Sequence, residues 1–420
     1  MQHTPVLVDS RRSWIITTAS LGIMMMAFGS AWITSVALKD IAAEVGGARS
    51  VPALAGALLW FASGVGGILM SWLADRIGVR WTVLAGTVSI AAGLAISTLG
   101  PQWPLWSGHA LLIGLVGIGA INAPLYVYVS HWFVKRRGSA LALISSGNYL
   151  AGAVWPSVFE PIISAVGWRQ TMLLYAVAQI VIIVPLALMF LRAAPEVSGG
   201  PAKAAGGHGA GKVLGLRPNT AFYLICVASV LCCLTMSMPQ QHLVALCSDL
   251  GFTRTFGAGL LAVLLGTAVF SRQVWGAVSD RIGGLFTILI TSTWQLSATA
   301  AFLLTQSEAG LITVSAFFGL GFAGIVPAYV LALRDLFPAR EAYWRVPTLL
   351  LFTAFGMGGG GWVAGVIYDH FGYYAPAFGA GVLFNAANLV IITFLVLWGG
   401  FDKRRKKLPP EPVVTTGAPA

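Results

Sequence analysis

The stretch SWLADRIGVR at residues 71–80 recurs as GAVSDRIGGL at residues 276–285. Both copies follow the pattern small-x-x-x-Asp-Arg-Ile-Gly, and each comes directly after a long apolar run. The copies lie 205 residues apart in a chain of 420 residues, so each half of the chain carries one. A charged turn repeated in this way predicts two structural repeats around a central cavity.

The composition indicates a protein that crosses a membrane many times. Apolar residues make up 57% of the chain and charged residues only 9%, whereas a soluble protein has about 25% charged residues. The mean hydropathy of +0.82 and the 50 glycines agree, because membrane helices use small residues to pack closely. The four cysteines lack metal-ligand spacing, so we expect packing rather than a metal site or disulfides: Cys226, Cys232, Cys233 and Cys247.

Runs of about 20 apolar residues, the length that spans a bilayer, predict an all-α membrane protein with twelve transmembrane helices. They lie at 14–38, 51–74, 81–99, 106–132, 139–164, 169–191, 220–246, 255–279, 285–305, 310–333, 346–368 and 374–399. Segment 192–219 is rich in Gly, Ala and Pro and predicts a flexible cytoplasmic linker. It separates an N-terminal six-helix bundle (1–191) from a C-terminal one (220–400), and a cytoplasmic tail follows at 401–420.

The basic residues predict the orientation of the chain. With a cytoplasmic N-terminus, 20 of the 25 Lys and Arg fall in cytoplasmic segments, and four fall outside: Lys39, Arg49, Arg169 and Arg254. We therefore expect both termini in the cytoplasm, and we attribute the net charge of +11 to topology and lipid contact rather than to nucleic acid. The first apolar run has no obvious cleavage site and predicts a retained helix. We expect the protein to lie in a plasma membrane, namely the inner membrane of a bacterium.

With these features the chain resembles the major facilitator superfamily, whose signature between the second and third helices is G-x-x-x-D-[RK]-x-G-[RK]-[RK]. The first copy has Ser71, Asp75, Arg76, Gly78 and Arg80 in these places, with Ser71 replacing a glycine and Val79 a basic residue. The second copy keeps Gly276, Asp280, Arg281 and Gly283. The resemblance implies two bundles that rock around a midplane site. It also implies cytoplasmic latches that join the bundles in one state, formed by Asp75, Arg76, Arg80, Asp280 and Arg281.

Within that superfamily, four stretches are similar to the monocarboxylate transporters and oxalate/formate antiporters. They are HWFVKRRGSALALISSGNYLAG (131–152), PQQHLVALCSDLGF (239–252), Arg272-x-x-x-Gly276-x-x-Ser279-Asp280-Arg281 and GGGWVAGVIYDHFGYYAPAF (359–378). This resemblance implies a secondary carrier for a small carboxylate, coupled to a proton or a counter-anion.

Arg272 is the one residue among the 25 Lys and Arg that lies inside a long apolar run. A charged guanidinium costs at least about 2.5–3.5 kcal/mol at the centre of a membrane helix, so such a group usually faces a cavity or a ligand. Its planar fork of donors suits a carboxylate, and the resemblance implies the same role. The alternative is an internal ion pair, although no Asp or Glu lies near the same depth in the sequence.

The sequence departs from the resembled branch at two charged positions. Monocarboxylate transporters carry a proton-accepting aspartate one turn before the arginine, where this chain has Ala268. The candidates for proton coupling are therefore His242, Glu160 or the substrate acid itself. A packing hydrogen bond for His242 and an interfacial position for Glu160 are the alternatives. The helix 11 lysine of dicarboxylate-type members is absent from 346–368, which favours a monoanion.

Five polar side chains at mid-depth are candidates to complete the substrate site. Asn122 and Tyr126 share a helix face because they lie four residues apart, and the others are Asn148, Tyr149 and Tyr329. Buried Asn and Tyr need hydrogen-bond partners, which a cavity or a neighbouring helix can supply.

Two other classes of function stay open at this point. An exporter of another organic anion or of amphipathic, drug-like metabolites differs in its substrate, and a transporter-derived receptor would bind a ligand without flux. The sequence has no H-E-x-x-H, nucleophile elbow or Walker loop, so we expect no enzyme activity and no cofactor. We expect the chain to act as a monomer.

Overall fold

A computed structural model describes residues 8–134, 136–192 and 213–407, and their regular structure is helical. The N-terminal half contains α1 (Arg11–Val36), α2 (Leu38–Ala43), α3 (Ser50–Ile77), α4 (Val79–Ser97), α5 (Trp103–Ser107), the π-helix η1 (Gly108–Ile118), α6 (Gly119–His131), α7 (Arg137–Ser145) and α8 (Gly147–Phe190). The C-terminal half contains α9 (Pro218–Asp249), α10 (Arg254–Ile282), α11 (Gly284–Leu304), α12 (Glu308–Phe322), α13 (Ile325–Leu336), α14 (Ala339–Phe371) and α15 (Ala375–Lys407). Much of the predicted linker (193–212) and of the predicted tail (408–420) lies outside the described residues.

The helices account for the predicted number of membrane crossings. Eleven helical spans in the described residues are long and apolar enough to cross a membrane, and one of them runs for 53 residues, from Gly138 to Phe190. One crossing needs only about 20 residues. Gly167 interrupts this span with φ 81° and ψ 165°, a conformation that glycine adopts without a Cβ clash. The span therefore supplies two crossings, which makes twelve.

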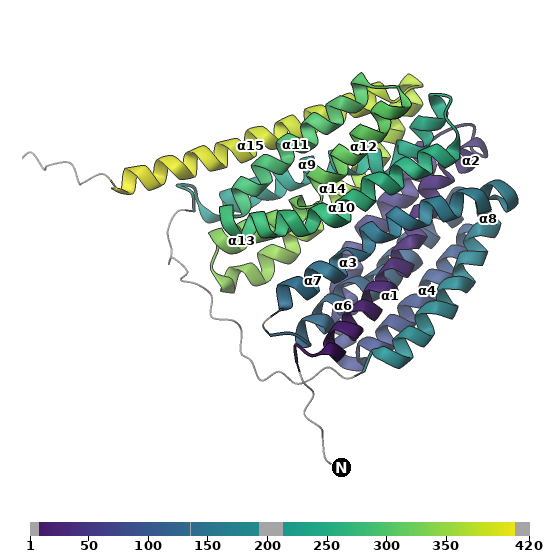
Figure 1. The fold of residues 1–420 in the computed structure, drawn as a ribbon, viewed down its shortest axis with the longest axis horizontal. Coiled ribbons are helices and arrows are strands. Elements are labelled where there is room, and N and C mark those ends of the chain that lie inside the picture. The colour runs from purple at the N-terminus through teal and green to yellow at the C-terminus, as the bar shows by residue number, and fades with distance from the viewer. Residues whose placement is uncertain (1–7, 135, 193–212, 408–420) are drawn as a thin grey trace, which may run out of the picture.

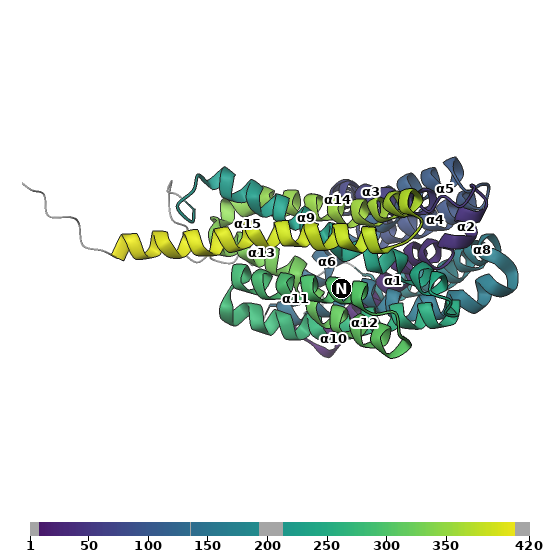
Figure 2. The same cartoon turned by 90° about the horizontal axis from the view of Figure 1, so that it is seen from above.

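The two halves of the chain lie side by side (Figure 1), and the view from above looks onto the C-terminal half, with α15 running along it (Figure 2). Within the N-terminal half, α1 packs on α8, and η1 packs on α3 and α4. Within the C-terminal half, α9 packs on α14 and α15, and α10 packs on α12. Across the halves, α3 packs on α14 and α8 packs on α10. The surface between the halves is therefore formed mainly by these four helices.

The two copies of the Asp-Arg-Ile-Gly motif form the same turn. Gly78 ends α3 with φ 88° and ψ 149°, and Gly283 ends α10 with φ 81° and ψ 163°. Each glycine also begins the next helix, so the repeated sequence produces a repeated helix–turn–helix corner. We call the end of the molecule that holds residues 75–80 and 280–284 the motif end. We call the opposite end, with residues 37–50, 249–254 and 369–374, the closed end.

Candidate functional site

Arg272 lies on α10 at the surface between the two halves. Its side chain is partly exposed, and its Cζ lies 5.2 Å from the ring centroid of Tyr149 on α8, which belongs to the other half. None of the ion pairs formed by the described residues involves Arg272. Within the described part of the chain, the guanidinium therefore has an aromatic neighbour and no neutralising carboxylate, an arrangement that leaves its donors available to an anion.

Two tyrosines of the N-terminal half lie near this arginine. The charge of Arg272 acts on the hydroxyls of both Tyr126 and Tyr149. The adjacent Asn148 has a buried Oδ1 with no hydrogen-bond partner among the described residues. Asn122 is partly exposed on α6, one turn from Tyr126. The structure thus places Arg272 with Tyr126 and Tyr149, and it places Asn122 and Asn148 on the same two helices.

Tyr329, another residue predicted to line the site, forms its hydrogen bond within the C-terminal half. Its hydroxyl donates to Asn388 Oδ1 at 2.8 Å, and the side chain is fully buried within the C-terminal half. Asn388 in turn donates to Asn385 Oδ1 at 2.9 Å. This chain of hydrogen bonds joins α13 to α15. It agrees with the alternative given for these tyrosines and asparagines, a hydrogen bond to a neighbouring helix.

Ion pairs at the closed end join the two halves of the molecule. Arg49 binds Asp249 with two hydrogen bonds, from Nη1 to Oδ2 at 2.6 Å and from Nη2 to Oδ1 at 2.7 Å. Lys39 Nζ lies 3.0 Å from the same carboxylate, and Arg254 pairs with Asp40. Burial opposes the charge of Arg49, but the hydrogen bonds and charge of Asp249 together with the contact to Tyr374 outweigh burial and raise the pKa of Arg49.

A carboxylate from the C-terminal half also caps a helix of the N-terminal half. Asp369, near the end of α14, accepts the backbone N–H of Arg49 at 2.7 Å and that of Ser50 at 3.0 Å. These groups begin α3, where the helix dipole favours a negative charge. The contact adds a second link to the ion pairs of Arg49.

Glu160, a candidate for proton coupling, belongs to the closed end rather than to the surroundings of Arg272. Its Oε2 accepts the hydroxyl of Thr255 on α10 at 3.0 Å, and its Oε1 accepts that of Ser164 at 3.1 Å. The side chain is 8% exposed. Glu160 therefore holds the halves together through a neutral donor, a role that it can fill as a carboxylate.

His242, the other candidate, is buried beneath the ion pairs of the closed end. Its Nε2 lies 2.7 Å from the Gly361 carbonyl oxygen, and its Nδ1 lies 2.9 Å from the Tyr374 hydroxyl. A carbonyl only accepts, so Nε2 carries the proton of the neutral ring and Nδ1 accepts from Tyr374. Arg49 Nη1 donates to the same hydroxyl at 2.8 Å. Burial raises the pKa of Tyr374, which keeps the phenol neutral and able to donate.

The residues predicted to form cytoplasmic latches do not join the halves in this conformation. Asp75, Arg76, Asp280 and Arg281 are exposed at the motif end. Arg76 stacks on Trp72 at 3.8 Å, and Arg80 Nε donates to the Leu191 carbonyl at 2.6 Å within its own half. The described residues thus hold the halves together at the closed end and leave these charges separate at the motif end.

The chain is similar to transporters of known name and known structure. Residues 20–342 match the Major Facilitator Superfamily. The "MFS transporter asaE" of Aspergillus flavus is 24% identical over 340 residues, which cover 80% of this chain and 75% of that protein. "Monocarboxylate transporter 13" of Bos taurus is 25% identical over 377 residues, which cover 88% of this chain and 85% of that protein.

A solved structure shares the fold. The crystal structure of a bacterial homolog of the human lysosomal transporter Spinster, in an inward-facing and occupied conformation, superposes with a TM-score of 0.66 at 15% identity. The match covers 95% of this chain and 99% of that chain.

Proposed function

Because the chain belongs to the Major Facilitator Superfamily, whose members are transporters and not enzymes, we propose that it carries a small organic monocarboxylate across the plasma membrane by alternating access. The observation that supports this substrate class is Arg272, a cation between the halves without a carboxylate partner among the described residues. The similarity to a protein named as a monocarboxylate transporter points the same way.

In this proposal the substrate carboxylate accepts two parallel hydrogen bonds from the Arg272 guanidinium. The Tyr149 ring lies 5.2 Å from the guanidinium, and the hydroxyl of Tyr126 lies within electrostatic range of it. In this proposal either hydroxyl donates a hydrogen bond to the bound anion. One fixed cation matches one negative charge, which favours a monoanion. In this proposal Asn122 on α6 and Asn148 on α8 contact the same substrate.

Transport then requires the closed end to open as the motif end closes. We assign the closed end to the outside, as the distribution of basic residues predicts, so that both termini are cytoplasmic. Asp75, Arg76, Arg80, Asp280 and Arg281 would pair once the halves rock together at the motif end. The ion pairs of Arg49, Lys39 and Arg254 would separate in the same step.

A thermal-shift screen of the purified chain tests the substrate class. Monocarboxylates of increasing size should raise the unfolding temperature, because a ligand that binds only the folded state stabilises it by mass action. The carboxamide of each acid is its control, since it has the same shape without the charge. Equal stabilisation by acids and amides would contradict a site built on Arg272 and would favour an exporter of neutral, amphipathic compounds.

We further propose that the coupled ion is a proton and that His242 takes it up. A proton on Nδ1 would leave the Tyr374 hydroxyl without its acceptor while Arg49 still donates to it. The charged ring would also face Arg49, with only Asp249 and Asp369 to offset the second positive charge. Protonation would therefore weaken the closed end and favour the outward-open state.

Proteoliposomes with an acidic exterior should accumulate the substrate through the wild-type chain. One pH unit can drive about tenfold accumulation when one proton moves with each molecule. The His242→Gln variant should retain counterflow but lose this accumulation, because the amide keeps hydrogen bonds without titrating. The Glu160→Gln variant tests the other candidate and should accumulate normally, because its amide oxygen can still accept from the Thr255 hydroxyl. If the wild-type chain accumulated the same amount of substrate with and without the pH gradient, proton coupling would be excluded.

A further inference from the structure

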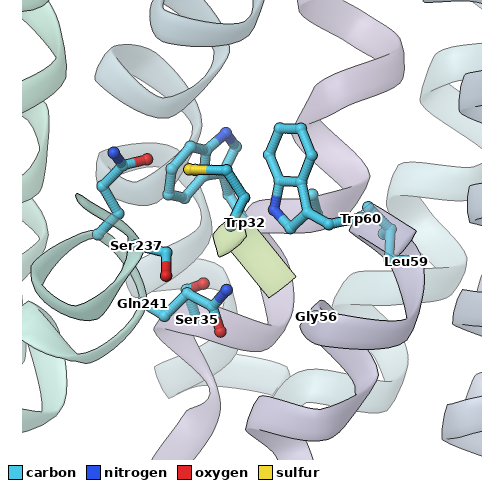
Figure 3. Close-up of a pocket in the computed structure, with 10 residues that line it drawn as sticks. Trp32, Ser35, Gly56, Leu59, Trp60, Ser237 and Gln241 are labelled. Carbon is cyan, nitrogen blue, oxygen red and sulfur yellow. The ribbon is translucent and has the colours of Figure 1, made fainter. Parts of the chain in front are cut away.

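The halves are packed closely where α1 and α3 meet α9 and α14, below the closed end. The pocket there is small (Figure 3), and it is lined by Ser35 and Gly56 from one half and by Ser237 and Gln241 from the other. A Cβ on Gly56 would lie 3.2 Å from Gln241 Oε1, so the Gln241 side chain fills the space beside this glycine. Little room is left here for a substrate, and the groups that can orient one lie around Arg272, between α8 and α10.

The membrane span Glu308–Leu336 is broken in its middle. α12 ends at Phe322, and α13 begins at Ile325. A helix leaves its last four carbonyls without partners of its own, and the hydrocarbon of a bilayer offers them no donor. Donors for the end of α12 must therefore come from a neighbouring helix. We call residues 319–322, the last turn of α12, the platform.

α10 supplies donors to two carbonyls of the platform. Trp275 Nε1 donates to the Leu320 carbonyl oxygen at 2.8 Å, and Ser271 Oγ donates to the Gly319 carbonyl oxygen at 3.0 Å. Both donor side chains are buried. The platform is therefore tied to the stretch of α10 that carries Arg272.

Two glycines let α10 and α12 approach each other closely. A Cβ on Gly319 would lie 2.1 Å from the Leu264 carbonyl oxygen, and a Cβ on Gly324 would lie 2.2 Å from Trp275 Cβ. Both distances are far shorter than a van der Waals contact, so a side chain at either position would push the helices apart. The contact therefore leaves α10 little freedom to turn against α12.

This contact determines the direction in which Arg272 points. Ser271 and Trp275 lie four residues apart, so they share one face of α10, and this face meets α12. Arg272 follows Ser271 and is turned from it by about 100° around the helix. Its guanidinium thus reaches Tyr149 of α8, in the other half, instead of α12.

The platform also contacts the aromatic neighbour of this arginine. The buried Phe322 meets the Tyr149 ring edge to face, with centroids 5.6 Å apart and an angle of 87° between the rings. Tyr149 therefore contacts both Phe322 and Arg272. One turn of α12 fixes the helix that carries the cation and also packs against the ring beside it.

We propose that the platform holds Arg272 in the orientation that binds the substrate carboxylate, with Trp275 as the principal positioning residue. This inference rests on the proposed function. Two parallel hydrogen bonds form only when the planes of the guanidinium and the carboxylate match. Loss of the bond from Trp275 lets α10 turn against α12, so one of the two hydrogen bonds to the substrate is lost. Trp275 acts through Arg272 and does not touch the substrate.

Two tryptophans of the C-terminal half provide a matched pair of variants. Trp275→Phe removes the indole N–H and keeps an aromatic ring. Trp294→Phe is the control, because Trp294 Nε1 on α11 donates to the Phe317 carbonyl of α12 at the same 2.8 Å. The phenylalanine of the control still places a ring beside Trp275, whose centroid lies 6.1 Å from that of Trp294.

Titration calorimetry with pyruvate, lactate and benzoate measures the effect on binding. Trp275→Phe should bind those acids that the wild-type chain binds about tenfold more weakly, because one charge-assisted hydrogen bond is lost. Trp294→Phe should bind them like the wild type. Ser271→Ala removes the second donor with little change in volume, and it should weaken binding about threefold even if Trp275→Phe does not fold. Equal weakening by Trp275→Phe and Trp294→Phe would show a general loss of packing and would overturn the inference.

The same titrations in the Arg272→Ala background show whether Trp275 acts through the arginine. Adding Trp275→Phe to Arg272→Ala should not weaken binding further, since no guanidinium remains to be oriented. A further tenfold loss in this background would mean that Trp275 affects binding by another route, and the inference would be wrong.

A measurement without ligand separates the inference from the proposed function. Trp275→Phe and Tyr149→Leu should together lower the unfolding temperature by less than the sum of their separate effects, because both disturb the same set of contacts. Trp294→Phe and Tyr149→Leu should be additive. Coupling of the first pair, combined with unchanged acid binding in Arg272→Ala or no binding of the three acids to the wild-type chain, would contradict the proposed function and uphold the platform. Additivity of the first pair would overturn the platform, whatever the acids do.

Discussion

Arg272→Ala should lower the affinity of the chain for its carboxylate substrate by at least about a hundredfold, because the substitution removes a bidentate, charge-assisted pair of hydrogen bonds. Each hydrogen bond to a charged group contributes about 1.5–3 kcal/mol. Arg272→Lys keeps the positive charge but lacks the two parallel N–H donors of the guanidinium. The affinity of this variant should therefore fall between those of the wild type and the alanine variant. Titration calorimetry measures the affinities, and counterflow of labelled substrate measures transport.

The control for this experiment is Arg334→Ala. Arg334 is exposed on α13, and its removal changes the net charge by the same amount without touching the space between the halves. The control should bind and transport like the wild-type chain. Wild-type affinity in Arg272→Ala would show that the substrate carboxylate binds elsewhere.

The fold was predictable because the membrane imposes simple requirements on a sequence. Each crossing needs about 20 apolar residues, so the twelve runs could be read directly. Gly78 and Gly283 hold the conformations that the repeated motif requires. The π-helix η1 was not predicted. A Cβ on Gly66 would clash with the backbone at Leu115, and this contact between α3 and η1 depends on two segments far apart in the sequence.

The candidate site was only partly predictable. Arg272 could be identified because a charged residue in an apolar run can be recognised from the sequence alone, without the tertiary structure. The hydrogen bond of Tyr329 to Asn388 could not be predicted, because depth in the membrane does not say which neighbouring helix a side chain meets. The partners of His242 are likewise set by packing, since Tyr374 lies 132 residues further along the chain.

The closed-end ion pairs were missed, although the sequence contains a signal for them. All four basic residues predicted to lie outside have a carboxylate partner in the structure. Lys39 and Arg49 pair with Asp249, Arg169 pairs with Glu44, and Arg254 pairs with Asp40. The loops predicted to lie outside contain few basic and few acidic residues. Because both kinds are confined to the same short segments, the sequence indicates that they pair with one another. Which pairs join the halves depends on tertiary structure, because the partners of Arg49 and Arg254 lie 200 and 214 residues away.

Asp249→Asn should open the closed end, because one carboxylate holds two cations of the other half. The Arg49 side chain is only 7% exposed, so the variant would leave a nearly buried charge without its anion. Removing one partner of a buried pair costs about 3–5 kcal/mol, and the 25% exposure of Asp249 places this site toward the lower end. Separation of the halves would return Arg49 and Lys39 to water and avoid that cost. The population should therefore shift toward the outward-open state.

A cysteine in place of Ser35 reports this shift, since Ser35 is 7% exposed and lines the pocket below the closed end. The native cysteines are buried, which limits background labelling. A membrane-impermeant maleimide added outside should label Ser35→Cys about a hundredfold faster in the Asp249→Asn background, as a shift of about 3 kcal/mol implies.

Glu44→Gln provides the matched control for the open state. Glu44 accepts two hydrogen bonds of 2.6 Å from Arg169, which lower the pKa of its carboxyl, but both residues belong to the N-terminal half. This variant removes an ion pair from the same end without separating the halves, so labelling should stay at the wild-type rate. Equal acceleration in both backgrounds would mean that any lost charge loosens this end. Unchanged labelling in Asp249→Asn would mean that packing of α3 on α14 and of α8 on α10 keeps the end closed without the ion pairs.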